Sequence, residues 1–259
     1  MSTLRLSQVA IQLYTLRDQC KTLPDFVAAL KKVRDIGYRS VQLSGVAVPH
    51  LDAKKALDDA GLTICATHEP GLEILEKPEA VCERLKSIGV TETAYPWPAG
   101  IDFKNEASVR KLAQGLDASG AIFTKHGINL SYHNHGIELT SFADTTVLDF
   151  IYRETKPENL KAELDTYWIQ YGGGDPAAWI EKLSGRVPIL HLKDYAFSKE
   201  DKPVFAEVGH GNLNWPRILA AAEKAGTQWL VVEQDTCPGD PFVSIRKSYD
   251  FLKTKLQAD

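Results

Sequence analysis

The sequence predicts an α/β protein in which residues 1–259 form a single domain, one closed (β/α)8 barrel. Short apolar segments rich in β-branched residues alternate with longer segments of helical period. The alternation repeats eight times, and roughly 250 residues is the usual length of such a barrel. An open doubly wound sheet is the alternative, but no Gly-x-Gly-x-x-Gly follows any predicted strand to support a dinucleotide site.

The predicted elements follow one another in a regular order. The first strand, 9–14, precedes a helix whose apolar residues recur at three- and four-residue steps from Phe26 to Ile36, between Pro24 and Gly37. The other strands are predicted at 38–43, 62–67, 90–95, 128–134, 160–165, 187–192 and 228–233. The other helices are predicted at 52–60, 78–88, 105–126, 144–154, 175–184, 215–225 and 242–255.

Composition disfavours several classes of function. The net charge is −4, and the basic residues are spread along the chain, so a nucleic-acid partner is not expected. No segment reaches the ~18 apolar residues of a membrane span, and the first ten residues lack the pattern of a secretory signal. The four cysteines are scattered and form no C-x-x-C pair, which favours reduced thiols over a zinc site. We expect a cytoplasmic protein.

Metal-ligating residue types stand at the ends of four successive predicted strands. These residues are His133, Asp165, His191 and Glu233. The active site of a (β/α)8 barrel lies at the carboxyl ends of its strands, so we expect the four side chains to converge. Two imidazoles and two carboxylates suit Mn, Co, Zn or Fe. The alternative for any one of them alone is a helix cap or a hydrogen-bonded polar group.

Further polar residues follow from the two-residue alternation of strands. His135, Lys193 and Asp235 lie one step beyond the four strand-end residues on the same faces, where proton-transfer groups are expected. Glu163 shares the face of Asp165 on the sixth strand.

Five other residues are weaker candidates for substrate contact. His68 and Glu69 follow the third strand and line the pocket or belong to an ordinary polar loop. Tyr14 and Trp97 either stack on a sugar or fill the barrel top. His210, between two glycines in the loop after the seventh strand, is expected to contact substrate or to belong to a simple turn.

Four motifs resemble those of the xylose-isomerase-like TIM-barrel superfamily. They are YHNHGIEL at 132–139, ELDTYW at 163–168, LHLKD at 190–194 and VVEQD at 231–235. Within the superfamily the sequence is most similar to the sugar phosphate isomerase/epimerase group, including inosose-dehydratase-like members. Segments 12–17 and 208–215 share the likeness, which therefore extends over nearly the whole chain.

The resemblance implies a divalent metal bound by one residue from each of strands five to eight. The family's Asp, His and Glu of strands six to eight correspond to Asp165, His191 and Glu233. Strand five departs from the common pattern, because many members have a glutamate where this sequence has His133. Since epimerases of the group are thought to use paired metal-bound glutamates, this departure puts a simple two-glutamate epimerisation in doubt. Trp168 likewise replaces a histidine found in many members.

The resemblance implies a metal-dependent isomerase or epimerase of a sugar or keto-sugar, phosphorylated or not. The metal would polarise a ketone and its neighbouring hydroxyl and stabilise an enediolate. His135 or Glu233 would act as general base, and Lys193 would neutralise the developing oxyanion. A metal-dependent dehydratase or lyase of a keto-sugar or keto-inositol and a non-catalytic sugar-binding module are the alternatives. A small sugar-like molecule is the expected partner, and a homo-oligomer is left open.

Overall fold

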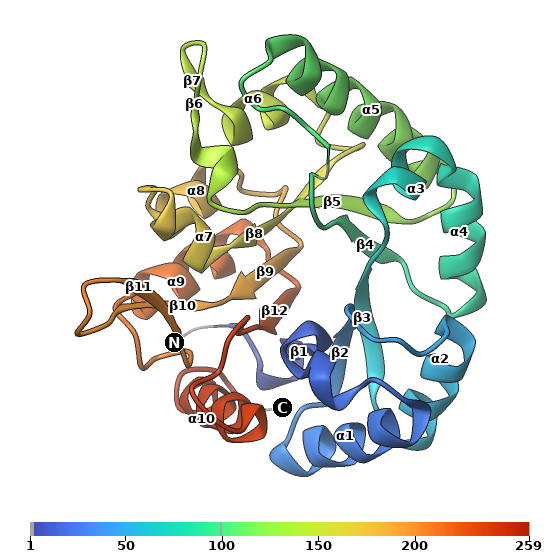
Figure 1. The fold of residues 1–259 in the computed structure, drawn as a ribbon, viewed down its shortest axis with the longest axis vertical. Helices are drawn as coiled ribbons and strands as arrows, with labels where there is room; N and C mark the ends of the chain where they lie inside the picture. The colour runs from blue at the N-terminus through green and yellow to red at the C-terminus, as the bar shows by residue number, and fades with distance from the viewer. Residues whose placement is uncertain (1–2, 99, 259) are drawn as a thin grey trace.

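A computed structural model describes residues 3–98 and 100–258 and confirms the closed (β/α)8 barrel (Figure 1). Eight parallel strands pair in the order β1-β12-β9-β8-β5-β4-β3-β2, and all eight predicted strands are present within two residues at each end. The strands are β1 (Val9–Gln12), β2 (Ser40–Leu43), β3 (Thr63–His68), β4 (Glu92–Tyr95), β5 (Asn129–His133), β8 (Lys161–Asp165), β9 (Ile189–Leu192) and β12 (Trp229–Val232).

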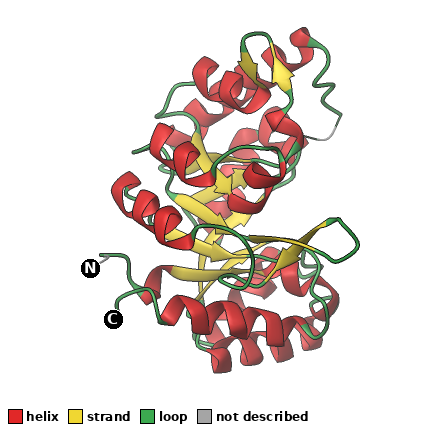
Figure 2. Ribbon diagram, turned by 90° about the vertical axis from the view of Figure 1, so that its left-hand side faces the viewer, coloured by secondary structure: helices red, strands yellow, loops and turns green. Residues whose placement is uncertain are grey.

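Helices cover the outside of the strands (Figure 2). Eight of them correspond to predicted helices, and their ends follow local signals; in the first, the Thr22 side chain accepts from the Asp25 amide and Gly37 ends the helix at a φ of 133°. The eight are α1 (Leu23–Ile36), α2 (His50–Asp59), α4 (Pro78–Ser87), α5 (Glu106–Lys125), α6 (Val147–Glu154), α8 (Pro176–Lys182), α9 (Trp215–Ala225) and α10 (Pro241–Lys253). Across residues 3–98 and 100–258, no helix is both long and apolar enough to cross a membrane.

The loops at the carboxyl ends of the strands contain elements that the sequence analysis missed. The predicted start of α6 at 144 is wrong, because the preceding residues form a short hairpin. Short helices and hairpins have too few residues to show a clear period, so local pattern does not reveal them. The missed elements are α3 (Gly71–Glu76), α7 (Thr166–Tyr171), the β6 (Ser141–Phe142)–β7 (Thr145–Thr146) hairpin, the β10 (Asp194–Phe197)–β11 (Pro203–Ala206) hairpin and the 3-10 segments Leu6–Gln8, Leu13–Gln19 and Ile137–Leu139.

Polar groups are buried inside the barrel. The main apolar core packs between strands and helices, and a separate small apolar cluster consists of Ala10, Cys65, Ala66, Ile189 and Val231. Gln42 and Glu163 are fully buried within the barrel, where Gln42 Nε2 donates to Glu163 Oε2 at 2.7 Å. A charged residue is also buried there. The Glu92 Oε1 atom accepts a hydrogen bond from Asn129, and its Oε2 atom has no hydrogen-bond partner.

Replacing Glu92 by glutamine is expected to stabilise the protein above neutral pH. Burial, reinforced by the charge of Glu163, raises the pKa of Glu92 to about 7. The folded protein therefore holds this proton more tightly than the unfolded chain, and stability falls as pH rises from the ordinary carboxyl pKa to about 7. At pH 8 the free energy of unfolding of Glu92→Gln should exceed that of wild type by roughly 2–3 kcal/mol.

Urea unfolding at pH 4 and at pH 8 measures this difference. The two proteins should be equally stable at the lower pH, where Glu92 is protonated in both states. Exposed Glu83, replaced by glutamine, is the control and should change stability little at either pH. A Glu92→Gln protein that is less stable than wild type at pH 8 would contradict the prediction.

Candidate metal centre

Four adjacent strands bring the predicted metal ligands together. The order β12-β9-β8-β5 places the ends of these strands side by side, and Asp165 pairs directly with His191 in the barrel register. One ligand atom from each of His133, Asp165, His191 and Glu233 lies within 4.8 Å of the others. All four residues are buried, so the group could hold a cation in the interior and is not a surface cluster.

His191 lies at the centre of the group. Its Nδ1 atom is 2.9 Å from Glu233 Oε2, and its Nε2 atom is 2.6 Å from Gln42 Oε1 and 3.0 Å from Glu163 Oε1. The Nδ1 atom of His133 also faces Glu163, at 3.3 Å from Oε1, but in a geometry that makes no hydrogen bond. A carboxylate therefore lies beside each of the two imidazoles.

Asp165 divides its two oxygens between structure and site. Its Oδ1 atom accepts from the Trp168 amide at 2.9 Å and so caps helix α7, which begins directly after strand β8. Its Oδ2 atom is buried, makes no hydrogen bond, and lies 3.0 Å from the Lys193 ammonium as an ion pair. The capping bond fixes the carboxylate plane and leaves Oδ2 facing the cluster.

Lys193 inserts its ammonium among three carboxylates. The Nζ atom is 3.0 Å from Asp165, 2.8 Å from Glu233 and 2.9 Å from Asp235. Burial favours the neutral amine, but the three negative charges outweigh it and raise the pKa of Lys193 well above its usual range. The ammonium also lies 5.7 Å from the centre of the Trp168 ring. This residue is a fixed positive charge at the edge of the ligand group.

The charge balance favours a dication. Burial lowers the pKa of a histidine. For His133, burial together with repulsion from His191 lowers the pKa to about 3. The pKa of His191 instead rises to about 10, because Glu163 and Glu233 outweigh its burial. Without a bound cation, a protonated His191 must therefore help to neutralise the buried carboxylates, a task that a divalent ion would take over. The Asp165 Oδ2 and His133 Nδ1 atoms make no hydrogen bond and are further metal-ligating atoms, so these residues fit a divalent metal.

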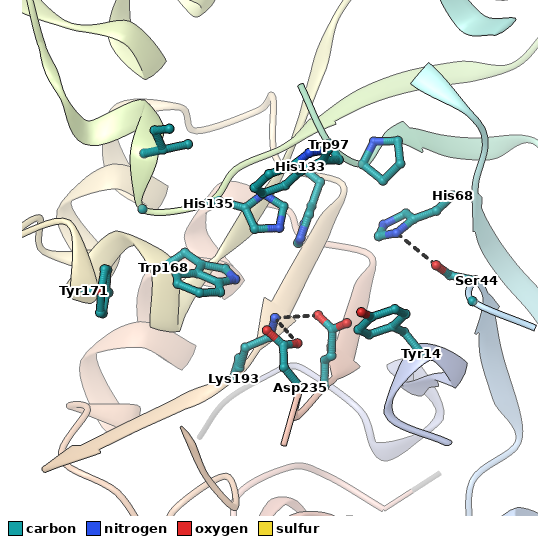
Figure 3. Close-up of a pocket in the computed structure, with 15 residues that line it drawn as sticks. Tyr14, Ser44, His68, Trp97, His133, His135, Trp168, Tyr171, Lys193 and Asp235 are labelled. Carbon is teal, nitrogen blue, oxygen red and sulfur yellow. Dashed lines mark hydrogen bonds and ion pairs between the residues drawn. The ribbon is translucent and has the colours of Figure 1, made fainter. Parts of the chain in front are cut away.

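A pocket of about 620 Å³ opens above this group (Figure 3). His68 and Ser44 lie on one side of it, and Trp168 and Tyr171 lie on the other. Eight of the residues singled out in the sequence as site candidates line it, Asp235 among them, whereas Asp165 and His191 are fully buried and do not line it. The lining residues are Tyr14, Ser44, Gly45, His68, Pro96, Trp97, His133, His135, Gly136, Ile137, Trp168, Tyr171, Lys193, Glu233 and Asp235.

The two histidines of the pocket wall differ in their partners. His135 packs edge-on against Trp97 and His133, and its buried Nδ1 has no hydrogen-bond partner. Burial, with the charges of His133 and Lys193, lowers the pKa of His135 to about 2, so its imidazole is neutral. His68 is held differently, with Nε2 at 2.5 Å from a Glu163 oxygen and Nδ1 at 3.2 Å from the Ser44 hydroxyl.

Two predicted substrate contacts lie outside the pocket. The Glu69 carboxylate is buried against Arg84, at 2.6 Å, and His50, at 3.1 Å. Glu69 follows His68 directly in the sequence. Because successive residues of an extended strand point in opposite directions, the Glu69 side chain points away from the pocket that His68 lines. His210 lies in the loop between β11 and α9, and its amide donates to the Glu207 carbonyl. Neither side chain lines the pocket in this structure.

Sequence reasoning missed Gln42 and Ser44 and gave Glu163 no role. Gln42 and Glu163 are fully buried inside the barrel and contact His191. The sequence did contain a signal for Gln42 and Glu163, since a polar residue inside an otherwise apolar strand is uncommon unless its hydrogen bonds are satisfied. This signal predicts that the residue is buried and hydrogen-bonded, but it does not identify the residues to which it bonds.

Comparison with known proteins decides the family. Residues 30–255 match the sequence profile of the xylose isomerase-like TIM barrel family. The chain belongs to this family. Its members include epimerases, isomerases and dehydratases.

Among curated relatives, the inosose dehydratase of Mesomycoplasma hyopneumoniae (strain 7448) is 30% identical over 164 residues, which cover 56% of this chain and 54% of that protein. The match thus spans about half the length of that relative. The inosose dehydratase of Clostridium beijerinckii is 25% identical over 254 residues, covering 90% of this chain and 82% of the relative.

Two solved structures show the same fold. A sugar phosphate isomerase/epimerase from Parabacteroides distasonis superimposes with a TM-score of 0.81 at 23% identity, covering 98% of this chain and 94% of that one. An L-ribulose 3-epimerase superimposes with a TM-score of 0.72 at 14% identity, covering 96% and 94%. At these identities the likeness shows a shared fold and does not identify the reaction.

Proposed function

We propose that this protein is a divalent-metal-dependent isomerase or epimerase of a sugar or keto-sugar. The observation that carries the proposal is the convergence of four buried donors, His133, Asp165, His191 and Glu233, beneath an open pocket. A metal bound there would act as a Lewis acid on a carbonyl and its neighbouring hydroxyl. Mn, Co, Zn and Fe all suit two imidazoles and two carboxylates.

The pocket supplies groups for the proton transfers. Lys193 is protonated and lies at the pocket floor, so it can donate to an oxygen that becomes negative as an enediolate forms. We propose His135 and Glu233, which are both unprotonated, as acceptors of the carbon-bound proton. The pKa is lowered to about 2 for His135 and well below the usual range for Glu233, so both are weak bases in the metal-free protein. His68, whose far nitrogen is held by Glu163, is a further acceptor on the Ser44 side of the pocket.

The rim of the pocket suits a sugar ring. Trp97 and Tyr14 line the pocket and are 52% and 39% exposed, so their rings are accessible for stacking on a sugar face. We therefore propose a small sugar-like molecule as the partner. We propose no nucleic-acid partner, and the metal identity and a cytoplasmic location stay predictions.

A dehydratase of a keto-sugar or keto-inositol is the second candidate. Inosose dehydratases are among the curated relatives, and His133 stands where a two-glutamate epimerase would need a carboxylate. The two reactions share the first step, removal of a proton beside a carbonyl. They differ in whether the proton returns to carbon or a β-hydroxyl leaves as water.

The test is reconstitution of the chelator-stripped protein with Mn, Co or Zn, followed by incubation with ketoses, aldoses and keto-inositols in deuterated water. Isomerisation or epimerisation gives a product with the same carbon skeleton and deuterium on carbon, whereas dehydration gives a product lighter by one water. Metal-dependent sugar binding without any product would favour the non-catalytic binding module. A protein that binds no metal would overturn the proposal.

A further inference from the structure

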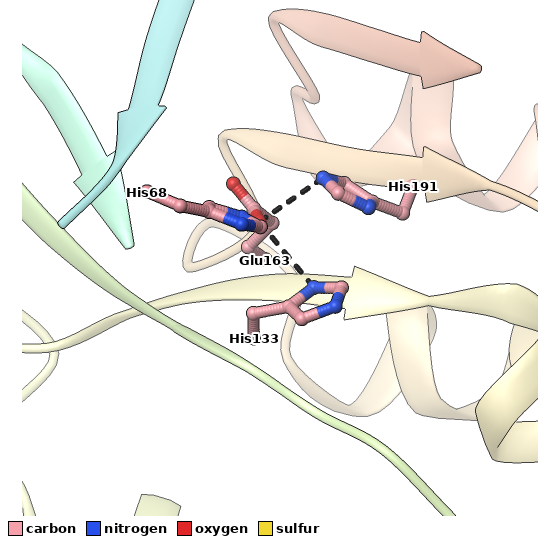
Figure 4. A group of neighbouring side chains, drawn as sticks. All are labelled: His68, His133, Glu163 and His191. Atoms are coloured by element: carbon pink, nitrogen blue, oxygen red, sulfur yellow. Dashed lines mark hydrogen bonds and ion pairs between the residues drawn. The ribbon is translucent and has the colours of Figure 1, made fainter. Parts of the chain in front are cut away.

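A buried hydrogen-bond network lies directly beneath the metal-ligand group. Glu163 is fully buried on β8, and its Oε1 atom is surrounded by the imidazoles of His68, His133 and His191 (Figure 4). Its Oε2 atom accepts from Gln42 Nε2 at 2.7 Å. Neither Gln42 nor Glu163 belongs to the set of four donors proposed above.

The direction of the hydrogen bonds in this network is determined at both ends. At one end the backbone amide of Tyr14, which can only donate, donates to Gln12 Oε1 at 3.4 Å. Gln12 therefore turns its Nε2 toward Gln42 Oε1, at 3.0 Å. At the other end the carboxylate of Glu163 accepts from Gln42 Nε2. Both ends assign Gln42 Oε1 as an acceptor, which removes the ambiguity of an amide flip.

This assignment places a proton on one nitrogen of His191. The Nε2 atom lies 2.6 Å from the acceptor Gln42 Oε1 and 3.0 Å from Glu163 Oε1, so it must be an N–H donor. The Nδ1 atom points to the opposite side, 2.9 Å from Glu233 Oε2, so without a metal it also donates. A metal shared by His191 and Glu233 would replace the Nδ1 proton, because the Nε2 proton is held by two acceptors outside the ligand group.

We propose that Gln42 and Glu163 are positioning residues that hold His191 in its Nε2–H tautomer and thereby make Nδ1 the metal-binding atom. The inference rests on the proposed metal site. Metal-bound histidines commonly donate their second N–H to a carboxylate or carbonyl oxygen, which orients the ring and makes it a stronger ligand. Here an amide oxygen and a carboxylate share that task.

The same argument opposes a second cation in the barrel interior. His68, His133, Glu163 and His191 also have donor atoms within 4.8 Å of one another, so distance alone would allow an ion there. A proton on His191 Nε2 removes that nitrogen, and His133, one of the three donors that remain, also belongs to the proposed metal site. The network therefore favours one metal ion per chain rather than two.

Removing either positioning residue is expected to weaken metal binding by about 10- to 100-fold. Zinc and manganese affinities are measured by chelator competition for wild type, Gln42→Leu and Glu163→Gln. Glu92→Gln is the matched control, because Glu92 is another buried carboxylate of the barrel with no contact to His191. Its metal affinity should equal that of wild type.

A second measurement reports the tautomer on wild type without any variant. In the zinc-loaded protein, nitrogen-15 NMR should show a protonated Nε2 and a metal-bound Nδ1 on His191, a signature that a merely structural role of Gln42 would not produce. Zinc on Nε2, two metal ions per chain, or unchanged affinity in both folded variants would overturn the inference alone. A wild type without metal would overturn the proposed function and this inference together.

Discussion

Asp165→Asn is expected to lose affinity for manganese, cobalt and zinc by more than about 100-fold. This loss is larger than the one expected when a residue that only hydrogen-bonds to a metal ligand is replaced. The substitution replaces a carboxylate, whose buried Oδ2 makes no hydrogen bond, by an amide group, which is a much weaker ligand for a divalent ion. Asparagine is also a good N-cap, so Oδ1 can still accept from the Trp168 amide and helix α7 should remain. The loss should therefore appear in metal binding rather than in folding.

Asp175→Asn is the matched control for this variant. Asp175 caps α8 as Asp165 caps α7, accepting from the amides of Ala177 and Ala178, but it lies outside the ligand group. Metal content is measured by elemental analysis after reconstitution and dialysis, and affinity by titration calorimetry. Near-stoichiometric metal in Asp165→Asn would contradict the assignment of Asp165 as a ligand.

Lys193→Met should lower the free energy of unfolding of the metal-free protein by about 3–5 kcal/mol. The substitution removes the ammonium from among Asp165, Glu233 and Asp235 and leaves three neighbouring carboxylates without it. Methionine has a similar length and no charge, so most of the loss comes from uncompensated negative charge rather than from a cavity. Divalent metal binds only the folded state and should restore part of the stability.

Urea unfolding with and without added manganese measures this effect. Lys182→Met is the control, because Lys182 pairs with a carboxylate on Asp149 but is half exposed, and its loss should cost less than about 1 kcal/mol. If Lys193→Met were as stable as the control variant in the absence of metal, the three ion pairs would have little energetic weight. The carboxylates would then hold Lys193 in its protonated form less firmly than proposed.

The barrel could be predicted because its signals are local. Alternating strand and helix periods, helix-ending glycines and capping residues such as Thr22 depend on neighbours a few positions away. The architecture then predicted which residues lie at one edge, since the parallel strands of a barrel all end on one face. These residues are His133, Asp165, His191 and Glu233. Segments with too few residues to show a period, such as α7, escaped this reasoning.

The direction of a side chain and its partners depended on contacts between distant segments. His68 and Glu69 are adjacent in sequence, yet one lines the pocket and the other pairs with Arg84. Gln42 and Glu163 are 121 positions apart and meet only because the barrel closes.

The sequence alone thus determined the strand order along the chain, the residue types at the strand ends and the chemistry that those types allow. Only the tertiary structure decided that Lys193 lies between three carboxylates and that a hydrogen-bond network from β1 to β8 contacts His191. The physical reason is that period and capping arise from short-range backbone geometry. Charge pairing and tautomer choice instead arise from buried groups that come within about 3 Å only after folding.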